Sequence, residues 1–392
     1  MASTDPKPFV INGAGIAGLT AALALARKNH RVVVFEKAEG FEMLGAGLQL
    51  SPNAMHVLNE LGLNRWILQV ASTPKTIEIS NGITGNRLAS LPLGQSIENK
   101  FGAPYCVIHR ADLQNILFNA CKANPIIDVH FSSEVNEMAP HNHGVTAMVD
   151  QGGEINEFRA AGLIIADGVW SSLRTKVIGL EAPVYSGKVA WRALVPTDEG
   201  TEDTSTHVWF GSKAHVVSYP IRSGNSLNLV VITDGPENSG KDTLSISSDA
   251  LKSKLKKWSG DFTKILDQKT RWTGWPLFEI KKAEHMAHGP IALIGDAAHA
   301  MLPFAAQGAA MAIEDAAVLA EEVSKNSRVH DAFAAYEKRR LPRVSKVAKT
   351  ARANGRIYHM SGIRSDFRDL GMWLTPTKLL SARQNWIYGW RP

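Results

Sequence analysis

The stretch Phe9-Val-Ile-Asn-Gly13-Ala-Gly15-Ile-Ala-Gly18 decides the fold of this chain. Its apolar run predicts a buried strand, and the alanine- and leucine-rich residues 19–27 predict a helix directly after the glycines. In such a strand-turn-helix, Gly13 permits the tight turn, Gly15 lets a pyrophosphate approach the backbone, and Gly18 lets helix and strand pack closely. The free N–H groups and the dipole of the helix N-terminus favour phosphate at this turn. The stretch therefore predicts a dinucleotide-binding α/β fold.

A second apolar run, residues 31–35, ends in an acidic residue, Glu36. An acid about 20 residues beyond such glycines accepts hydrogen bonds from ribose hydroxyls, which favours an adenosine ribose without a 2′-phosphate. A glycine-rich turn alone is often only a turn. The strand, the helix, the second strand and the terminal acid together favour the binding interpretation.

Length and cysteine content restrict the class of protein. A chain of 392 residues with 44% hydrophobic residues can bury a large core and predicts two or three domains. Cys106 and Cys121 are too few for a disulfide framework and wrongly spaced for a zinc site, so we expect no metal and a reducing compartment. The N-terminus lacks a signal pattern, and no apolar run is long enough to span a bilayer. We expect a cytoplasmic protein, either a monomer or a homodimer.

The net charge of +6 raises the question of nucleic-acid binding. The basic residues are dispersed, however, and the densest run, Lys338-Arg-Arg-Leu-Pro-Arg343, continues with helical spacing to Lys346 and Lys349. This pattern predicts the solvated face of a long helix rather than a nucleic-acid site. A general positive field that attracts anionic ligands is compatible with the same charge.

The order of predicted elements indicates an interrupted domain. Strands and helices alternate up to residue 71, residues 74–102 predict short strands and turns, and residues 145–149 and 154–158 predict a hairpin. Alternating segments at 188–195, 207–210, 214–220 and 228–232 predict a second, sheet-based domain, and helices follow from 308. We expect an FAD-type Rossmann domain (1–75, 101–183 and 284–345), an inserted β-sheet substrate domain (76–100 and 184–283) and a helical C-terminal tail (346–392).

Two later segments resemble further walls of the same site. An apolar strand ends in Asp167-Gly168, and Ser171 or Ser172 caps a following helix that carries Arg174, which suits phosphate and ribose contacts. Another apolar strand ends in Gly295-Asp296, and a small-residue helix begins at Gly308, where backbone N–H groups could meet an anion. Taken singly, these are an ordinary strand-to-helix turn and a closely packed helix.

Taken together, the motifs GAGIAGL, GAGLQLSPNA, HRADL, ADGVWSSLR, LIGDAAHAMLPFAAQGAAMAIEDA and YEKRRLPR resemble the single-component FAD-dependent aromatic hydroxylases. The greatest similarity is to the branch of salicylate hydroxylase and 6-hydroxynicotinate 3-monooxygenase, and it covers residues 8–345. The resemblance implies FAD contacts from Gly13, Ala14, Gly15, Gly18, Glu36, Lys37, Gly47, Arg110, Val135, Asp167, Arg174, Asp296, Pro303, Gln307, Gly308 and Ala309.

The resemblance also implies the chemistry. NADH or NADPH reduces FAD, O2 forms a flavin C4a-hydroperoxide, and an oxygen atom is transferred to an activated aromatic ring. Deprotonating a ring hydroxyl assists this transfer, so the second domain should supply a base. His215 is the candidate, and Tyr219 shares its strand face. A structural or surface role for His215 is the alternative.

Three further residues are candidates for substrate contact. Gln49 lies where one branch of the family carries a histidine near the substrate, which argues against a pyridine-ring substrate. Trp191 and Arg192 lie on a strand that could face the pocket, and Arg192 could hold a carboxylate or form a surface ion pair. We therefore predict a monooxygenase acting with O2 on a small phenolic or carboxylated ring.

Two alternatives stay open at this point. The first is a ring hydroxylase of quinone biosynthesis that acts at a membrane surface, with peripheral contact through Trp386-Ile-Tyr-Gly-Trp390, although a packed tail is the simpler interpretation of that stretch. The second is a flavin- or nucleotide-binding protein without turnover.

Overall fold

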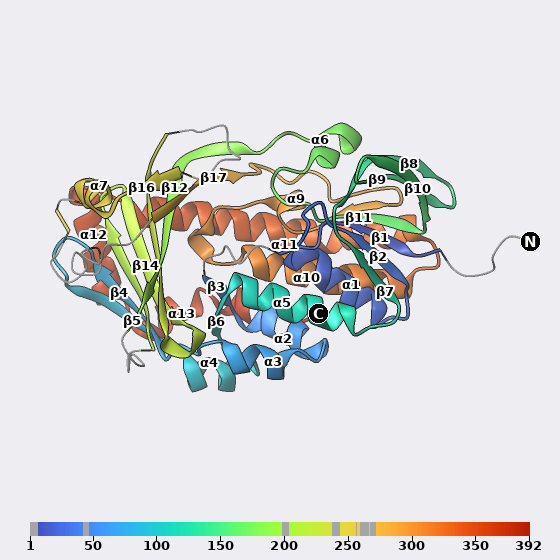
Figure 1. Cartoon of the computed structure of the whole chain (residues 1–392). Helices are drawn as coiled ribbons and strands as arrows, with labels where there is room; N and C mark the ends of the chain where they lie inside the picture. The colour runs from blue at the N-terminus through green and yellow to red at the C-terminus, as the bar shows by residue number, and fades with distance from the viewer. Residues whose placement is uncertain are drawn as a thin grey trace, which may run out of the picture.

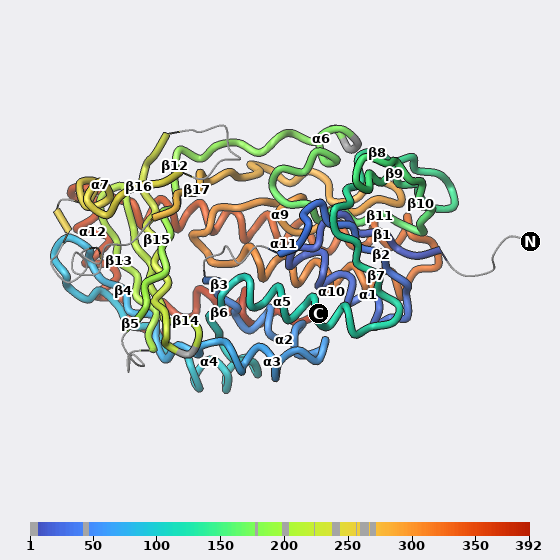
Figure 2. Tube along the Cα trace, viewed as in Figure 1, coloured from blue at the N-terminus to red at the C-terminus, as the bar shows by residue number. Residues whose placement is uncertain are grey.

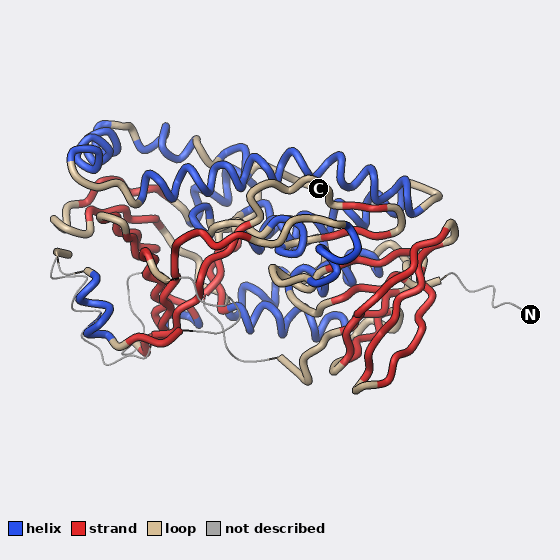
Figure 3. The backbone as a smooth tube through the Cα atoms, turned by 90° about the horizontal axis from the view of Figure 1, so that it is seen from above, coloured by secondary structure: helices blue, strands red, loops and turns tan. Residues whose placement is uncertain are grey.

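The two largest sheets of the described structure lie toward opposite ends of the molecule, with helices between them (Figure 1). The computed structural model describes residues 7–41, 47–197, 204–236, 244–255, 257–258, 266 and 272–392. Helix α11 (Val329–Tyr358) runs from the first sheet to the second, and α10 (Gly308–Lys325) packs against α11 and α1 (Ile16–Ala26). Figure 3 shows the two groups of strands from above. No helix in the described ranges is long and apolar enough to cross a membrane.

The first sheet has six strands in the order β18-β19-β11-β1-β2-β7. Its central strand β1 (Phe9–Asn12) is buried throughout and pairs in parallel with β2 (Val32–Phe35) and β11 (Gly162–Ile165). Strand β19 (Ile291–Leu293) extends the parallel set beyond β11, β7 (Ile127–His130) extends it beyond β2, and β18 (Ala287–His288) is antiparallel. Because β19, β11 and β1 are neighbours, their carboxyl ends meet at one edge of the sheet.

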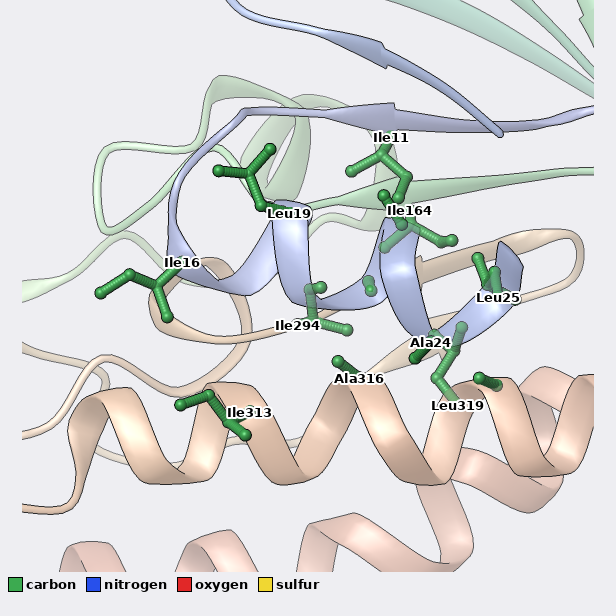
Figure 4. Close-up of a cluster of buried hydrophobic side chains, with 14 of the residues drawn as sticks. Ile11, Ile16, Leu19, Ala24, Leu25, Ile164, Ile294, Ile313, Ala316 and Leu319 are labelled. Atoms are coloured by element: carbon green, nitrogen blue, oxygen red, sulfur yellow. The ribbon is translucent and has the colours of Figure 1, made fainter. Parts of the chain in front are cut away.

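Helix α1 (Ile16–Ala26) is buried between this sheet and α10. Figure 4 shows Leu19 and Leu25 of α1 near Ile11 and Ile164 of the sheet, and Ala316 and Leu319 of α10 on the other side. A helix covered on two sides needs apolar residues all round, which explains its Ala- and Leu-rich sequence. A Cβ at Gly18 would lie 1.9 Å from the carbonyl oxygen of Gly13, so this close packing requires glycine.

The second sheet has eight strands in the order β16-β17-β12-β15-β14-β13-β4-β5. Its strands are β4 (Thr76–Asn81), β5 (Arg87–Pro92), β12 (Val184–Pro196), β13 (Thr206–Gly211), β14 (Ala214–Ile221), β15 (Ser226–Asp234), β16 (Leu244–Ile246) and β17 (Trp272–Glu279). One face packs in a core with α7 (Ser248–Lys254), and that core includes Trp191, Val216 and Val231. Since side chains alternate along a strand, Arg192, His215 and Tyr219 lie on the opposite face.

Smaller elements complete the fold. Strands β3 (Gly47–Leu50) and β6 (Cys106–His109) pair with each other, and β8 (Ser133–His141), β9 (Gly144–Gln151) and β10 (Glu154–Ala160) form a three-stranded sheet. Strands β8, β9 and β10 lie at the end of the molecule beside the first sheet (Figure 2). The helices not yet named are α2 (Pro52–Glu60), α3 (Asn64–Val70), α4 (Gly94–Phe101), α5 (Arg110–Lys122), α6 (Ser172–Ile178), α9 (Asp296–His299), α12 (Ile363–Leu374), α13 (Thr377–Ala382) and α14 (Asn385–Tyr388).

The fold differs from the sequence-based expectation in two places. Residues 74–102 contain a helix, α4, as well as strands, and its Ile97 and Phe101 are buried one turn apart, a helical spacing that the expectation overlooked. The expected boundary at 345/346 falls inside α11, which continues without interruption to Tyr358.

The basic run on α11 is also not simply a solvated face. It is helical as predicted, but Arg340 is 1% exposed and Arg343 donates to the buried carboxylate of Glu314. The C-terminal stretch is packed: Ile387 and Tyr388 are buried, and Arg343 lies over the rings of Trp386 and Trp390.

Candidate functional site

The three segments singled out in the sequence meet at the carboxyl edge of the first sheet. They are the β1–α1 turn, the β11–α6 turn and the β19–α9 turn, which follow adjacent strands. The backbone N–H of Ala166 donates to the carbonyl of Asn12 at 2.8 Å, and Ile294 N–H donates to the carbonyl of Ile165 at 3.0 Å. Gly13 adopts φ +109°, where an L side chain would be strained, and Gly295 lies at φ +59°. Backbone conformation therefore forms much of this wall.

Asn12 connects β1 to two neighbouring segments at this edge of the sheet. Its side-chain amide donates to Asp167 Oδ2 at 3.4 Å, and its Oδ1 accepts from the backbone N–H of Val135 at 3.1 Å. The residue ties the end of β1 to the β11–α6 turn and to β8. An apolar residue at position 12 could not make these two bonds.

The first cavity, of about 320 Å³, lies against the β1–α1 turn. Glu36 is held at this turn because its carboxylate accepts from Ala14 N–H at 2.8 Å and from Ala38 N–H at 3.0 Å. The residues around the cavity include Gly13, Gly15, Glu36, Lys37, Arg110, Glu134, Asp167 and Gly168.

Asp167 is the most perturbed carboxyl group of this cavity. Burial raises its pKa to about 6, although a hydrogen bond from Ser171 and the charge of Lys37 act in the opposite direction. Its Oδ1 atom is buried without a hydrogen-bond partner in the described structure. A buried acceptor of this kind requires a donor, and a sugar hydroxyl supplies one.

The second cavity, of about 310 Å³, continues from the first, because both are lined by Gly15, Arg110, Ala166 and Gly168. It lies between the edge of the first sheet and the open face of the second. The first sheet and its helices contribute Asp296, Pro303, Gly308 and Ala309, and the opposite wall contains Gly47, Gln49, Arg192, His215 and Tyr219.

The third cavity, of about 140 Å³, adjoins the second at Gln49, His215, Val217, Pro303 and Ala306. Its other walls are mainly apolar and aromatic, with Tyr105, Phe210, Tyr358 and Tyr388 among them. A cavity of about 150 Å³ in a protein core is large enough to bind benzene. The third cavity therefore has room for a single aromatic ring.

His215 lies where the second and third cavities join. It is 2% exposed on β14, and its Nδ1 is 2.7 Å from Nε2 of His359, which follows α11. Burial lowers the pKa of His215 well below the ordinary value, and His359 and the charge of Lys188 lower it further. The imidazole is therefore neutral near pH 7, so one of its nitrogens is a hydrogen-bond acceptor.

A buried ionic cluster supports the β19–α9 turn. Asp315 accepts from Gly295 N–H at 2.9 Å, from His299 at 2.6 Å and from Arg340 at 2.7 Å. Burial alone would raise the pKa of Asp315, but the charges of His299 and Arg340 lower it to about 2. Glu314 binds Arg340, Arg343 and the amide of Asn53. The cluster fixes α10 against α11 and thereby places Asp296.

Several predicted contact residues lie behind the cavity wall. The guanidinium of Arg174 donates to the carbonyls of Glu181, Ala297 and Ala298, and Gln307 is bonded to Ser51 and Asn53. Ala14, Gly18 and Val135 are also among the residues that support the wall without lining a described cavity. Trp191 faces the opposite core, where its indole N–H donates to Thr233.

Sequence reasoning missed two polar residues of the site. Tyr105 donates to Gln49 Oε1 at 2.5 Å at the edge of the third cavity, and His359 reaches His215 from 144 residues away. Neither lies in a motif, and no local pattern indicates that these side chains meet. The first two residues of the motif at 45–54 lie outside the described residues.

Comparisons with known proteins identify the family of this chain. The sequence profile of a family described as FAD binding domain matches residues 8–351. The chain belongs to this family. It is 35% identical over 386 residues to 3-hydroxybenzoate 6-hydroxylase 1 of Aquipseudomonas alcaligenes, covering 97% of each chain. It is 32% identical over 364 residues to 6-hydroxynicotinate 3-monooxygenase of Pseudomonas fluorescens, covering 90% and 92%.

A solved structure gives the same result. The chain matches a salicylate hydroxylase substrate complex with a TM-score of 0.81 and 25% identity over 99% and 96% of the two chains. The protein is thus an FAD-dependent aromatic monooxygenase that uses NAD(P)H and O2, as predicted. Neither alternative function finds support in these relatives.

The described residues fit FAD. A Cβ added at Gly15, Gly168 or Gly308 would meet nothing within 4 Å, so all three glycines leave open space. The first two cavities form one continuous groove, as an elongated dinucleotide requires, and the unpartnered Oδ1 of Asp167 lies beside it. Glu36, Asp167 and Asp296 are the residues that would hold sugar and ribityl hydroxyls.

Proposed function

We propose that this enzyme hydroxylates a single-ring hydroxybenzoate, such as 3-hydroxybenzoate, para to the phenolic hydroxyl, with His215 as the base that takes the phenol proton. The names of its relatives support the substrate class, because position 6 of 3-hydroxybenzoate is para to the hydroxyl. Bound FAD supplies the reduction by NAD(P)H and the activation of O2. The protein's own residues bind the ring, orient it and remove a proton.

The position of His215 carries this proposal. Nδ1 of His215 is hydrogen-bonded to His359, so Nε2 is the nitrogen available to a substrate in the two cavities that His215 lines. A phenolate is a better nucleophile than a phenol toward an electrophilic oxygen, so removing the proton activates the ring. Pro303 and Ala306 line both cavities beside His215, so the cavity for the ring opens next to His215 into the cavity that would hold the flavin.

Arg192 is the proposed partner of the substrate carboxylate. It lines the second cavity, its Nε is buried without a hydrogen-bond partner in the described structure, and no described carboxylate forms an ion pair with it. Burial, together with the charge of Arg110, lowers its pKa to about 10, so it is still charged at neutral pH. A half-buried guanidinium without a carboxylate partner, packed only over the ring of Trp275, favours an anionic ligand.

Gln49 is proposed to orient the ring. Its Oε1 accepts from the hydroxyl of Tyr105, which leaves the amide N–H groups for the two cavities that it lines. An amide donor fixed in this way can bind a hydroxyl or carboxylate oxygen of the substrate.

A substrate panel tests the proposal. The purified protein, loaded with FAD, is mixed with NADH or NADPH and with 2-, 3- or 4-hydroxybenzoate, benzoate or phenol. We expect 3-hydroxybenzoate to stimulate NAD(P)H oxidation most and to give a product heavier by one oxygen, identified by mass and retention time as the 2,5-dihydroxy acid. Stimulation by benzoate equal to that by the hydroxybenzoates would contradict the role of the phenol.

We also propose a cytoplasmic location. Both cysteines are free and buried, and burial raises the pKa of each thiol to about 12, which suits a protein that does not use disulfides. Fractionation of cells that express the tagged protein would test this location.

A further inference from the structure

The hydrogen bond between His215 and His359 joins two residues that line different cavities. On one side, His215 lines the second and third cavities. On the other side, His359 lines a separate basic pocket of about 730 Å³. The basic residues of this pocket are Lys188, Lys349, Arg352, Arg356 and Arg364. The two imidazoles thus connect the aromatic cavity to a pocket outside the active site.

Aromatic rings hold the pair in place. The ring centroids of His215 and His359 are 5.0 Å apart, Phe304 lies 5.3 Å from His215 and 5.6 Å from His359, and Tyr358 lies 5.3 Å from His215. These contacts restrict ring rotation. The 2.7 Å hydrogen bond therefore lies within a packed cluster of aromatic rings.

The hydrogen bond determines which nitrogen can act as the base. If His215 accepts a phenol proton at Nε2, its own N–H must be at Nδ1 and must donate to Nε2 of His359. His359 must then carry its N–H at Nδ1. That atom is buried and has no hydrogen-bond partner within the described ranges, so no carboxylate holds its proton.

We propose that His359 receives the proton displaced from His215, so that the two imidazoles conduct the phenol proton from the aromatic cavity to the basic pocket; this rests on the proposed function. The phenol O–H bond breaks as an N–H bond forms at Nε2 of His215. The Nδ1–H bond of His215 breaks as an N–H bond forms at Nε2 of His359, and His359 releases its Nδ1 proton to a water molecule that enters the basic pocket, which this residue lines. One proton enters, one leaves, and no electrons are exchanged.

The surrounding charges give the transfer a direction. Lys188 of β12 and its partner Asp234 of β15 face the pair from the second sheet, and Lys349, Arg352 and Arg356 face the pocket from α11. Burial lowers the pKa of His359 to about 4, and the charge of Lys188 lowers it further while Asp234 opposes this. An imidazole in this surrounding releases its proton rather than keeping it, and the pocket provides the route to solvent.

Proton release on binding of 3-hydroxybenzoate to the FAD-loaded, oxidised enzyme tests the relay. Stopped-flow mixing in weak buffer with a pH indicator gives the rate of proton release, and absorbance gives the rate of phenolate formation. We compare the wild type with His359→Ala, His359→Gln and Met360→Leu, which alters a neighbouring residue of the same pocket. Reduction of FAD by NAD(P)H is measured for each variant.

We expect His359→Ala to slow proton release and phenolate formation by at least about 10-fold, within the range of lost acid–base catalysis, and added imidazole to restore much of the rate. His359→Gln should remain slow, because an amide can orient His215 but does not relay a proton. Met360→Leu and flavin reduction should stay near wild type.

Other results would overturn the relay. Wild-type proton release in His359→Ala, or full activity in His359→Gln, would show that His359 only packs against His215 or orients it. If His359→Ala does not fold, the Gln variant alone decides. Failure of the proposed function is a separate result, because the wild type itself would then release no proton with 3-hydroxybenzoate.

Discussion

On the flavin side of the site, three turns at the ends of adjacent strands form the wall largely from backbone and glycines. On the substrate side, individual side chains reach in from β3, β12, β14, the residue before β6 and the end of α11. The first side is built from short segments of consecutive residues, and the second from residues that are distant in the sequence. The two sides should therefore respond differently to substitution: one through cofactor retention and stability, the other through chemistry with FAD still bound.

The largest expected effect lies on the substrate side. His215→Ala removes the proposed base, and we expect the hydroxylation rate to fall roughly 10²–10⁴-fold, with more peroxide released per NAD(P)H oxidised. FAD should remain bound, because no described turn at the edge of the first sheet depends on His215. The measurements are single-turnover product formation, peroxide yield and flavin content. Unchanged coupling between NAD(P)H oxidation and hydroxylation would remove His215 from the mechanism.

The flavin side should show its largest effect in stability. Arg340→Met leaves Glu314 and Asp315 buried with one cation fewer, and breaking such a pair costs about 3–5 kcal/mol. We expect the free energy of unfolding of the apoprotein, measured in urea, to fall by that amount. Arg339→Met is the control, since the Arg339 side chain is 38% exposed and its ion pairs should contribute less than about 1 kcal/mol. Equal losses in the two variants would show that burial of the cluster is unimportant.

The same contrast explains what the sequence could predict. Gly13 to Gly18, Asp167-Gly168 and Gly295-Asp296 each lie within a strand-turn-helix whose pattern is local, so the cavity edge could be located from them. His359 could not be found in this way, because only the path of α11 brings it to His215. Trp191 and Arg192 were both candidates for the pocket, yet adjacent strand residues face opposite sides, so at most one of them could line it.

Arg340 illustrates a further limit. The run at 338–343 has the charge and spacing of an exposed helix face, and the carboxylates that bury Arg340 lie on a different helix, α10. A basic residue on an amphipathic pattern is ordinarily exposed. Arg174 is a similar case. Its guanidinium donates hydrogen bonds to the backbone carbonyls of Ala297 and Ala298, and no sequence pattern indicates that these groups meet.

Substitutions at two glycines of the β1–α1 turn distinguish the close packing of helix and strand from the binding of FAD. In Gly18→Ala the new Cβ would meet the carbonyl of Gly13 at 1.9 Å, whereas in Gly15→Ala it would meet nothing within 4 Å. We expect Gly18→Ala to destabilise the apoprotein by about 1–3 kcal/mol. Gly15→Ala should unfold like the wild type but bind FAD more weakly, because its methyl group enters the first two cavities. Equal FAD affinity in Gly15→Ala and wild type, by fluorescence titration, would contradict a cofactor at this turn.

Arg192 tests the charge of the substrate. Arg192→Met removes the cation proposed to meet the carboxylate, and loss of a charge-assisted hydrogen bond of about 1.5–3 kcal/mol corresponds to an increase in KM of roughly 10- to 150-fold. Phenol, which lacks the carboxylate, is the matched control and should lose little. If KM rose equally for both compounds, Arg192 would act on the flavin or on the shape of the cavity instead.

The pH dependence of stability tests the flavin side through Asp167. Its folded-state pKa of about 6 lies above the ordinary value of 3.8, so between these values the folded apoprotein holds a proton that the unfolded chain releases. The resulting stabilisation is present below about pH 4 and is lost as pH rises through 6, on the order of 2 kcal/mol after allowance for partial exposure. Asp167→Asn should flatten this part of the urea-midpoint profile. In the FAD-loaded protein the dependence should weaken or reverse, because ribose hydroxyls that donate to Asp167 favour its charged form; a profile identical with and without FAD would place the cofactor away from this carboxyl.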